Sequence, residues 1–540
     1  MILPWKSRVF KAERANISHN RHIRIHQSAA NSPDCGLGTN SGRAMPKTIA
    51  AVYLLLVLLG LGGARAEEAT NGELPTRVAT HHTMALDNRQ IGYEAVAETL
   101  PVTDAKGSIT ASIFTVGYIA DGENRGDRPV SFVFNGGPGA ASVFLHLGAL
   151  GPQILETPQN GAVPSPPLRI VDNQATWLGF TDLVFIDPVG TGFSRGKGKE
   201  DNPDRPFWDV HADIASLGSV IRLWLTRHQR WTAPIYLVGE SYGGFRAAAM
   251  AHSLPHDVGV IVKGLALVSP ALDLSALHQT ERDLLAAAFI LPSYAATAAA
   301  FEVLPSVRDA AEAERFALAD YLVGLAGIKG QPSAGDPFIT RVAQISGVPA
   351  DIVRRYRGRI PRHIFAREIR RKEGEVVSLY DSMVARPAGP EGGENAADPV
   401  LQPAVAAYGT AFNAYLAETL GVHTDLSYRV LPRDISQQWN WEGERQHGTD
   451  GLAMSSFEKA LLEHPDTKVL IVNGRYDLVT PYFASLWLVD QLEVPAAVRA
   501  GIRLRVYEGG HMVYMRPEAR SLLARDAAEL YGAVGNAPSQ

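Results

Sequence analysis

Cysteine is nearly absent from this sequence, because Cys35 is the only one among 540 residues. One thiol excludes intrachain disulfides and zinc sites built from several cysteines. Cys35 also lies in an N-terminal segment that we expect to be removed from the mature chain. The mature protein is therefore expected to have no thiol nucleophile. It must be stabilised by a hydrophobic core, for which the chain is long enough.

Several ligand-binding motifs are absent as well. The chain contains no His-Glu-x-x-His zinc motif and no Gly-Lys-Ser/Thr phosphate loop. Gly190-x-Gly192 begins like a dinucleotide-binding loop, but Arg195 stands where the third glycine is needed. We therefore expect no metal and no cofactor.

The apolar run near the N-terminus is too short to cross a membrane comfortably. It occupies residues 49–61, follows Lys47 and precedes Ala64-Arg65-Ala66. A positive flank, a short apolar core and an Ala-x-Ala site are typical of a cleaved secretory signal. We predict a signal peptide at residues 45–66 and an exported protein, either periplasmic or secreted. Residues 1–44 are expected to be a disordered or non-native leader.

The chain has no net positive charge. The chain has 51 Lys and Arg residues against 56 Asp and Glu residues. Residues 1–66 hold nine of the basic and two of the acidic residues, so the remainder carries a net charge of −12. Such a charge does not attract nucleic acid or anionic membranes, and neither is expected as a partner.

The most informative stretch that the sequence does contain is GESYGG at residues 239–244. An apolar run precedes it at residues 235–238, and small residues follow at 247–250. This context is typical of a nucleophile elbow, a sharp turn between a strand and a helix that exposes a serine hydroxyl. Ser241 is therefore the candidate nucleophile.

Six apolar runs predict buried and largely parallel strands with helices on both faces of the sheet. They lie at residues 130–134, 183–186, 235–238, 261–268, 469–472 and 504–506. Alternating runs between residues 82 and 118 predict antiparallel strands that come first in the chain. The predicted fold class is α/β with a mostly parallel central sheet.

The alternation of strands and helices stops after Pro270. Helical patterns follow at residues 280–289, 307–325, 339–345, 350–356 and 404–420. We predict a mainly helical cap that forms a lid over the carboxyl ends of the strands, with a Pro/Gly-rich linker at residues 388–399. The expected organisation is a flexible lead (67–80), a first core part (81–275), the cap (276–430) and a second core part (431–535).

Two candidate partners for the serine follow later strands. Asp477 comes after the run at residues 468–472, and His511 comes after the run at 503–507. An elbow serine requires an acid and then a histidine in this chain order. We predict that His511 takes the proton of Ser241 and that Asp477 orients the imidazole.

The loop after the first predicted parallel strand reads NGGPG at residues 135–139. Consecutive glycines let backbone N–H groups approach a ligand closely. In a fold with a nucleophile elbow, this loop supplies one oxyanion donor and the residue after the nucleophile supplies the other. Gly137 and Tyr242 are the candidate donors.

Four blocks together resemble the serine carboxypeptidase family. They are NGGPG at residues 135–139, DPVGTGFS at 187–194, GESYGG at 239–244 and GHM at 510–512. The similarity spans roughly residues 80–535 and implies an α/β-hydrolase fold with an inserted cap. It also implies removal of single residues from the C-termini of peptides, so peptides with a free C-terminus are the expected substrates.

In that family the motif Asn and the Glu before the nucleophile bind the free carboxylate of the substrate, which implies this role for Asn135 and Glu240. An Asn offers N–H donors, and a protonated Glu can donate a hydrogen bond to a carboxylate. The chain departs from better-known members at Ala149, where an acidic residue usually shares a proton with that Glu. Because the mature chain is expected to have no cysteine, it resembles the exported, disulfide-free bacterial members of that family.

Two functions other than a carboxypeptidase remain open. The triad of an α/β-hydrolase also serves esterases and acyltransferases, and some relatives act in this way. A non-catalytic exported binding protein is the third possibility, which the intact set of Ser241, Asp477 and His511 disfavours.

Overall fold

The computed structural model describes residues 74–122, 126–274, 276–277, 283–303, 310–389, 397–441 and 453–533. The leader and signal peptide predicted at residues 1–66 lie outside these ranges, as do residues 390–396 of the predicted linker. No helix in the described ranges is both long enough and apolar enough to cross a membrane.

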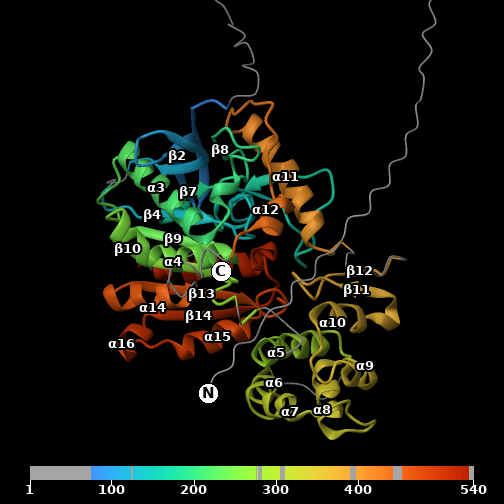
Figure 1. Cartoon of the computed structure of the whole chain (residues 1–540). Helices are drawn as coiled ribbons and strands as arrows, with labels where there is room; N and C mark the ends of the chain where they lie inside the picture. Colours follow the sequence, from blue (N-terminus) through green and yellow to red (C-terminus); the bar gives the residue numbers. More distant parts are fainter. Residues whose placement is uncertain are drawn as a thin grey trace, which may run out of the picture. The chain divides into compact units, whose positions relative to one another are not determined.

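A single large sheet organises the chain (Figure 1). Among the described residues it has ten strands in the order β1-β2-β3-β7-β4-β9-β10-β13-β14, and β8 pairs with β3. The strands are β1 (Arg77–Leu86), β2 (Arg89–Thr103), β3 (Ile109–Ala120), β4 (Val130–Phe134), β7 (Asp182–Ile186), β8 (Arg195–Gly196), β9 (Ile235–Glu240), β10 (Val262–Val268), β13 (Lys468–Gly474) and β14 (Ile502–Tyr507).

The strand directions confirm the predicted fold class. The first strands, β1, β2 and β3, are antiparallel, and β3 also pairs antiparallel with β7. Every pairing from β7 to β14 is parallel. The carboxyl ends of these parallel strands therefore meet at one edge of the sheet, where ligands bind in α/β folds. This is the α/β-hydrolase architecture.

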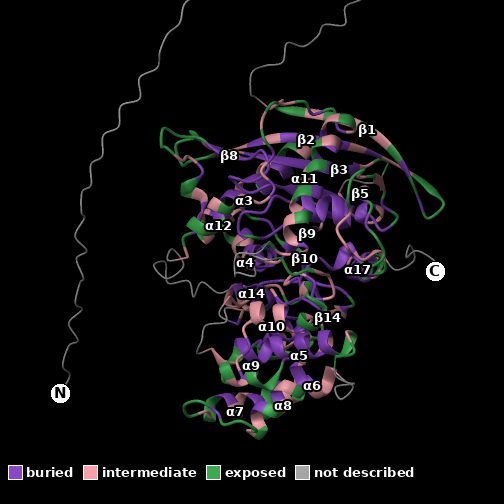
Figure 2. Ribbon diagram, turned by 90° about the vertical axis from the view of Figure 1, so that its right-hand side faces the viewer, coloured by how far each residue is buried: buried purple, intermediate pink, exposed green. Residues whose placement is uncertain are grey.

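Helices cover both faces of the sheet, because alternate residues of each strand point to opposite sides. Along β4, Val133 faces one hydrophobic cluster, whereas Phe132 and Phe134 face another. Helices α3 (Val210–His228), α4 (Tyr242–Asp257) and α14 (Ala453–Glu463) belong to the second cluster. Helices α11 (Leu401–Glu418) and α17 (Pro517–Leu530) belong to the first. Figure 2 shows strands β3 and β9 as largely buried.

The flexible lead predicted at residues 67–80 is wrong from Arg77 onward. Residues 77–86 form β1, which pairs with β2 along its whole length. Its inward positions include the polar side chains of Thr80 and His82, and His82 stacks on Tyr93. The strand thus lacks the apolar alternation by which a strand is recognised in a sequence.

The insertion is less uniform than predicted. Its first helices bury a hydrophobic cluster of their own together with the start of α15 (Tyr482–Gln491), as the group beside α15 in Figure 1 shows. These helices are α5 (Leu284–Ala300), α6 (Ala310–Phe316), α7 (Leu322–Gly327), α8 (Pro337–Ser346), α9 (Ala350–Arg355) and α10 (Arg362–Glu368). A hairpin of β11 (Glu375–Val377) and β12 (Ala385–Pro387) follows, which the helical prediction missed. Helix α11 packs on the sheet instead of on this group.

Two pieces of the insertion reach the carboxyl edge of the sheet. The carbonyl of Tyr380 accepts a hydrogen bond from the N–H of His511 at 2.5 Å. The carbonyl of Val430 accepts one from the N–H of Ala141 at 2.9 Å, in the loop after β4. The insertion therefore touches the strand-end loops that carry the predicted site residues.

A buried charge cluster lies at the opposite end of the parallel strands. Asp182, the first residue of β7, forms ion pairs with Arg128 at 2.7 Å and with Arg230. The three side chains are at most 4% exposed. One carboxylate therefore pairs with two buried guanidinium groups.

Asp182→Ala should lower the free energy of unfolding by about 3–5 kcal/mol, because it removes a buried carboxylate that pairs with two buried guanidinium groups. Urea unfolding followed by circular dichroism measures the change. Asp121→Ala is the matched control, since Asp121 pairs with His81 at the surface and its loss should cost less than about 1 kcal/mol. Equal losses for the two variants would contradict this account.

Candidate active site

The sharp strand-to-helix turn predicted at Ser241 is present. This residue separates β9, which ends at Glu240, from α4, which begins at Tyr242. Its φ of 59° and ψ of −124° lie outside the regions that serine favours. A Cβ on Gly239 would stand 2.0 Å from the carbonyl oxygen of Gly243, so only glycine permits this close approach. Ser241 is partly exposed, as a nucleophile must be.

Asp477 and His511 form a buried, hydrogen-bonded pair. Their Oδ2 and Nδ1 atoms lie 2.8 Å apart, and neither side chain is more than 5% exposed. Asp477 also accepts hydrogen bonds from the N–H groups of Val479 and Thr480 at 2.7 and 3.0 Å, and from the Thr480 hydroxyl at 2.6 Å. These contacts fix the carboxylate, which in turn directs Nε2 of the imidazole away from Asp477.

The charge state of His511 reflects these neighbours. Burial alone would lower the pKa of its imidazole, but the carboxylates of Asp477 and Glu240 outweigh burial and raise that pKa above 6.5. An imidazolium formed by proton transfer is therefore stabilised at this position.

The elbow and the histidine are linked through the segment after β10. Ser241 donates its N–H to Val268 and accepts from Ala271, both at 3.0 Å. Between these two residues, the hydroxyl of Ser269 donates to the carbonyl of His511 at 2.8 Å. No hydrogen bond joins the Ser241 hydroxyl to the imidazole in the described structure. Catalytic hydrogen bonds of this kind are often long without substrate and tighten in the complex.

The loop predicted to hold an oxyanion donor lies against the elbow. A Cβ on Gly136 would stand 2.5 Å from the backbone N of Tyr242 and 2.9 Å from Cβ of Ser241. Gly137 follows with a φ of +102°, which a residue with a side chain rarely adopts. The structure thus places the loop that carries Gly137 beside Tyr242 and Ser241.

Arg246 holds this loop, and sequence reasoning did not find it. Its side chain is fully buried and donates to Asp213 at 2.6 Å and to the carbonyl of Asn135 at 2.6 Å. Its guanidinium also lies over the ring of Tyr242, 4.8 Å from the centroid. One helical turn separates Arg246 from Tyr242, so both face the same loop. The signal in the sequence was a lone arginine in a run of small residues.

The two residues predicted to bind a carboxylate form one buried group. The side-chain amide of Asn135 donates to Glu240, and its oxygen accepts from the N–H of Leu145 at 2.9 Å, which orients the amide. The hydroxyl of Tyr514 donates to both oxygens of Glu240, at 3.0 and 2.9 Å. Burial raises the pKa of Glu240 to about 7, despite the His511 charge and these hydrogen bonds, which favour the ionised form.

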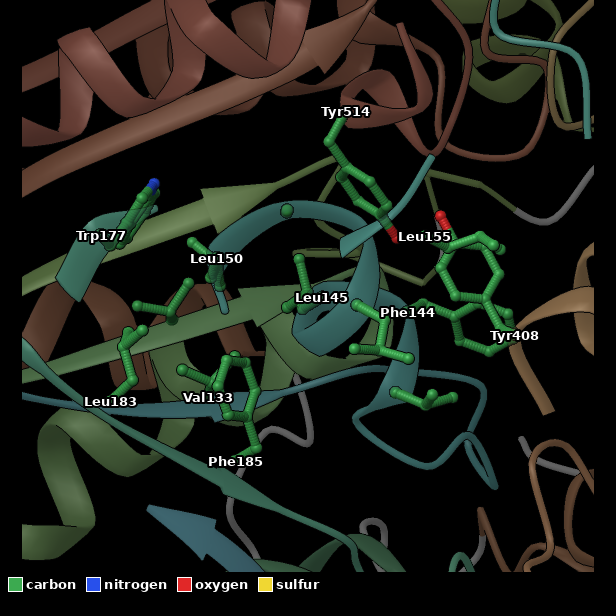
Figure 3. Close-up of a cluster of buried hydrophobic side chains, with 14 of the residues drawn as sticks. Val133, Phe144, Leu145, Leu150, Leu155, Trp177, Leu183, Phe185, Tyr408 and Tyr514 are labelled. Atoms are coloured by element: carbon green, nitrogen blue, oxygen red, sulfur yellow. The ribbon is translucent and has the colours of Figure 1, made fainter. Parts of the chain in front are cut away.

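Two tyrosines stand beside Gly148, the residue before Ala149, where the family that the sequence resembles is expected to have an acidic residue. A Cβ on neighbouring Gly148 would lie 2.6 Å from the ring of Tyr514 and 2.7 Å from the hydroxyl oxygen of Tyr408. Figure 3 shows both rings at one end of the first hydrophobic cluster. The Tyr408 hydroxyl is buried and has no hydrogen-bond partner among the described residues. Tyr514 lies three residues after His511, so its closeness to the GHM motif could have identified it as a site residue. Tyr408 comes from α11, and no motif near it in the sequence indicates a role in the site.

Arg246→Lys should slow labelling of Ser241 by a fluorophosphonate by about 10–100-fold, because an ammonium cannot hold Asp213 and the Asn135 carbonyl together. The measurement is the second-order rate constant of labelling on folded protein. Arg230→Lys is the matched control, since Arg230 is an equally buried arginine outside the site. Labelling of the two variants at the same rate would show that Arg246 does not position the loop.

Comparison with solved structures gives distant likenesses. The peroxisomal alpha-beta-hydrolase Lpx1 from Saccharomyces cerevisiae is 11% identical, with 87% of this chain and 92% of that chain covered and a TM-score of 0.34. Esterase E22 is also 11% identical, with 81% and 100% covered and a TM-score of 0.38. The fold assignment depends on the strand order and directions of the sheet rather than on these scores.

Comparison with known sequences is more specific. Serine carboxypeptidase-like 9 from Arabidopsis thaliana is 29% identical over 140 residues, which is 25% of this chain and 30% of the relative. The retinoid-inducible serine carboxypeptidase of Rattus norvegicus is 30% identical over 135 residues, 24% of this chain and 26% of the relative. The chain thus spans less than a third of the length of these relatives.

A sequence model of one family matches residues 110–287, and that family is described as serine carboxypeptidase. The matched segment contains three of the four blocks, including the loop at residues 135–139 and the elbow. The resemblance to the serine carboxypeptidase family that these blocks predict is thereby confirmed over residues 110–287.

Proposed function

We propose that this protein is a serine carboxypeptidase that removes the last residue of peptides with a free C-terminus. The observation that carries the proposal is the buried pair of Asn135 and Glu240 next to the elbow serine. A hydrolase that acts on uncharged esters does not need a carboxyl group of raised pKa at that position. A peptidase that reads a terminal carboxylate does.

In the proposed reaction, Ser241 attacks the carbonyl carbon of the last peptide bond and transfers its proton to His511. The N–H groups of Gly137 and Tyr242 donate to the oxyanion. His511 then gives the proton to the leaving amino acid, so the peptide bond breaks and an acyl-enzyme remains. Water attacks the acyl-enzyme with His511 as the base, which restores Ser241. Asp477 keeps the imidazole oriented and stabilises its cation throughout.

Carboxylate recognition depends on the proton of Glu240. An ionised Glu240 would repel the carboxylate of the substrate, whereas a protonated one donates a hydrogen bond to it. Asn135 contributes a second donor. The hydroxyl of Tyr408 is buried, and the nearby charge of Glu240 contributes to raising its pKa. This hydroxyl has no hydrogen-bond partner among the described residues, so it can serve as a third donor to the carboxylate of the substrate.

The proposal is tested with two peptides that differ only in a free or amidated C-terminus. We expect kcat/KM to be at least about 100-fold higher for the free acid, since a lost charge-assisted contact to a buried group costs about 3 kcal/mol. Ser241→Ala should abolish both activities with the fold retained. Equal rates for the two peptides would instead support an esterase or acyltransferase, and no labelling of Ser241 by a fluorophosphonate would support a non-catalytic binding protein.

The pH dependence should report Glu240 directly. Its protonated form is present below a pKa of about 7 and is lost as the pH rises through that value. The kcat/KM of a free-acid peptide should therefore fall above about pH 7, while that of an ester without a carboxylate should not. Tyr514→Phe removes a hydrogen bond to the ionised form, which raises the pKa of Glu240 and moves this limb up by about one pH unit.

Tyr408→Phe is the matched control for Tyr514→Phe, because no hydrogen bond links Tyr408 to Glu240 in the described structure. It should leave the alkaline limb in place and raise KM for free-acid peptides. A limb that stays fixed in Tyr514→Phe would exclude Glu240 as the titrating group.

A further inference from the structure

Two histidines and a glutamate converge on the surface between α4 and α14. His252 and His256 lie one helical turn apart near the end of α4, and Glu463 is the last residue of α14. His252 Nδ1 and His256 Nε2 are each 3.1 Å from the same oxygen, Oε2 of Glu463. In the described ranges no other three residues with His, Cys, Asp or Glu side chains come together in this way.

The spacing of these atoms is close to that of ligands around a tetrahedral metal ion. The three ligand atoms all lie within 4.8 Å of one another. With metal–ligand bonds of about 2.0–2.1 Å, two ligands of Zn²⁺ stand about 3.3 Å apart. Two imidazoles and one carboxylate are also the set that binds Zn²⁺ through three protein ligands and leaves a fourth position open. The side chains are 28%, 57% and 39% exposed in the order His252, His256 and Glu463, so water can reach the fourth position.

Hydrogen bonding and metal binding require opposite protonation states of the two nitrogens that face Glu463. For both histidines to donate to one carboxylate oxygen, each must carry a proton on the nitrogen that faces it. If both rings were also charged, they would repel each other across 4.9 Å between ring centroids. A cation at the centre accepts lone pairs from two neutral imidazoles and neutralises the carboxylate at the same time.

The geometry points to a binding site for a divalent transition-metal ion, represented by Zn²⁺, that crosslinks the ends of α4 and α14. Helix α4 begins at Tyr242 beside the candidate nucleophile, and the cluster lies at its other end. Helix α14 leads into β13, after which Asp477 follows. The metal stabilises the packing of these helices and takes no part in chemistry at Ser241.

Isothermal titration of untagged protein with Zn²⁺ tests the site. The untagged protein should bind one ion, and His252→Asn and Glu463→Gln should each weaken binding by at least about 10-fold. At a Zn²⁺ concentration of about 100 times the Kd of the unsubstituted protein, its Tm should rise by about 2–3 °C, and the Tm of the two variants should rise by no more than about half as much. His81→Asn is the matched control, because His81 is an exposed histidine that pairs with the carboxylate of Asp121 away from the cluster, and its loss should leave binding unchanged.

Absence of saturable binding up to about 1 mM Zn²⁺ would overturn the proposal, as would equal binding by the His252→Asn variant. All variants are surface substitutions, and circular dichroism verifies that they are folded. Turnover is measured on the same samples. Because the site is independent of the proposed peptidase function, loss of metal binding should leave turnover unchanged, and failure of the peptidase assays would not affect the metal result.

Discussion

The turn at Ser241 is the constraint on which the rest of the site depends. A serine with a φ of 59° is held in a conformation that costs about 1–3 kcal/mol, and only surrounding structure can impose it. That structure is the buried strand β9 on one side and the start of α4 on the other. The two approach so closely that a Cβ at Gly239 would collide with the carbonyl of Gly243.

The same crowding extends to the loop after β4. Gly136 lies against Tyr242 and Ser241, and its carbonyl and that of Asn135 face the guanidinium of Arg246. Asp213 on α3 neutralises this guanidinium. One buried ion pair therefore ties α3, α4 and the loop together, so the expected oxyanion donors are positioned by the core rather than by the flexibility of the loop.

Features that depend on short stretches of the chain could be predicted from the sequence. The elbow, the parallel strands and the Asp477–His511 pair were predicted from runs of residues and their order, whereas the shared role of Asn135 and Glu240 was implied by the resemblance to the serine carboxypeptidase family. β1 was missed because its inward face carries Thr80 and His82, whose polarity hides the alternation. The division of the insertion was missed because only tertiary packing decides that α11 joins the sheet while α5 to α10 form a separate group.

Residues such as Arg246 and Tyr408 could not be assigned from the sequence for a related reason. Each contacts a segment far away in the chain, and neither lies in a motif of its own. The replacement of an acidic residue by Ala149 was visible in the sequence. Its consequence was not, because the group that contacts Glu240 instead is the hydroxyl of Tyr514.

A tyrosine beside Glu240, in place of a second carboxyl group, changes which groups can hold the proton of Glu240. Two carboxyl groups can share a proton, whereas Tyr514 keeps its own, because burial raises the pKa of its hydroxyl well above 10. The protons that matter for the proposed reaction are then those of Glu240 and His511, because the charge of each group shifts the pKa of the other. Asp477 favours the state with an imidazolium, and burial favours the state with a neutral pair. The proposed reaction needs the neutral pair, since Glu240 must donate and His511 must accept. A terminal carboxylate that binds to protonated Glu240 selects this state, so substrate binding itself would make His511 basic.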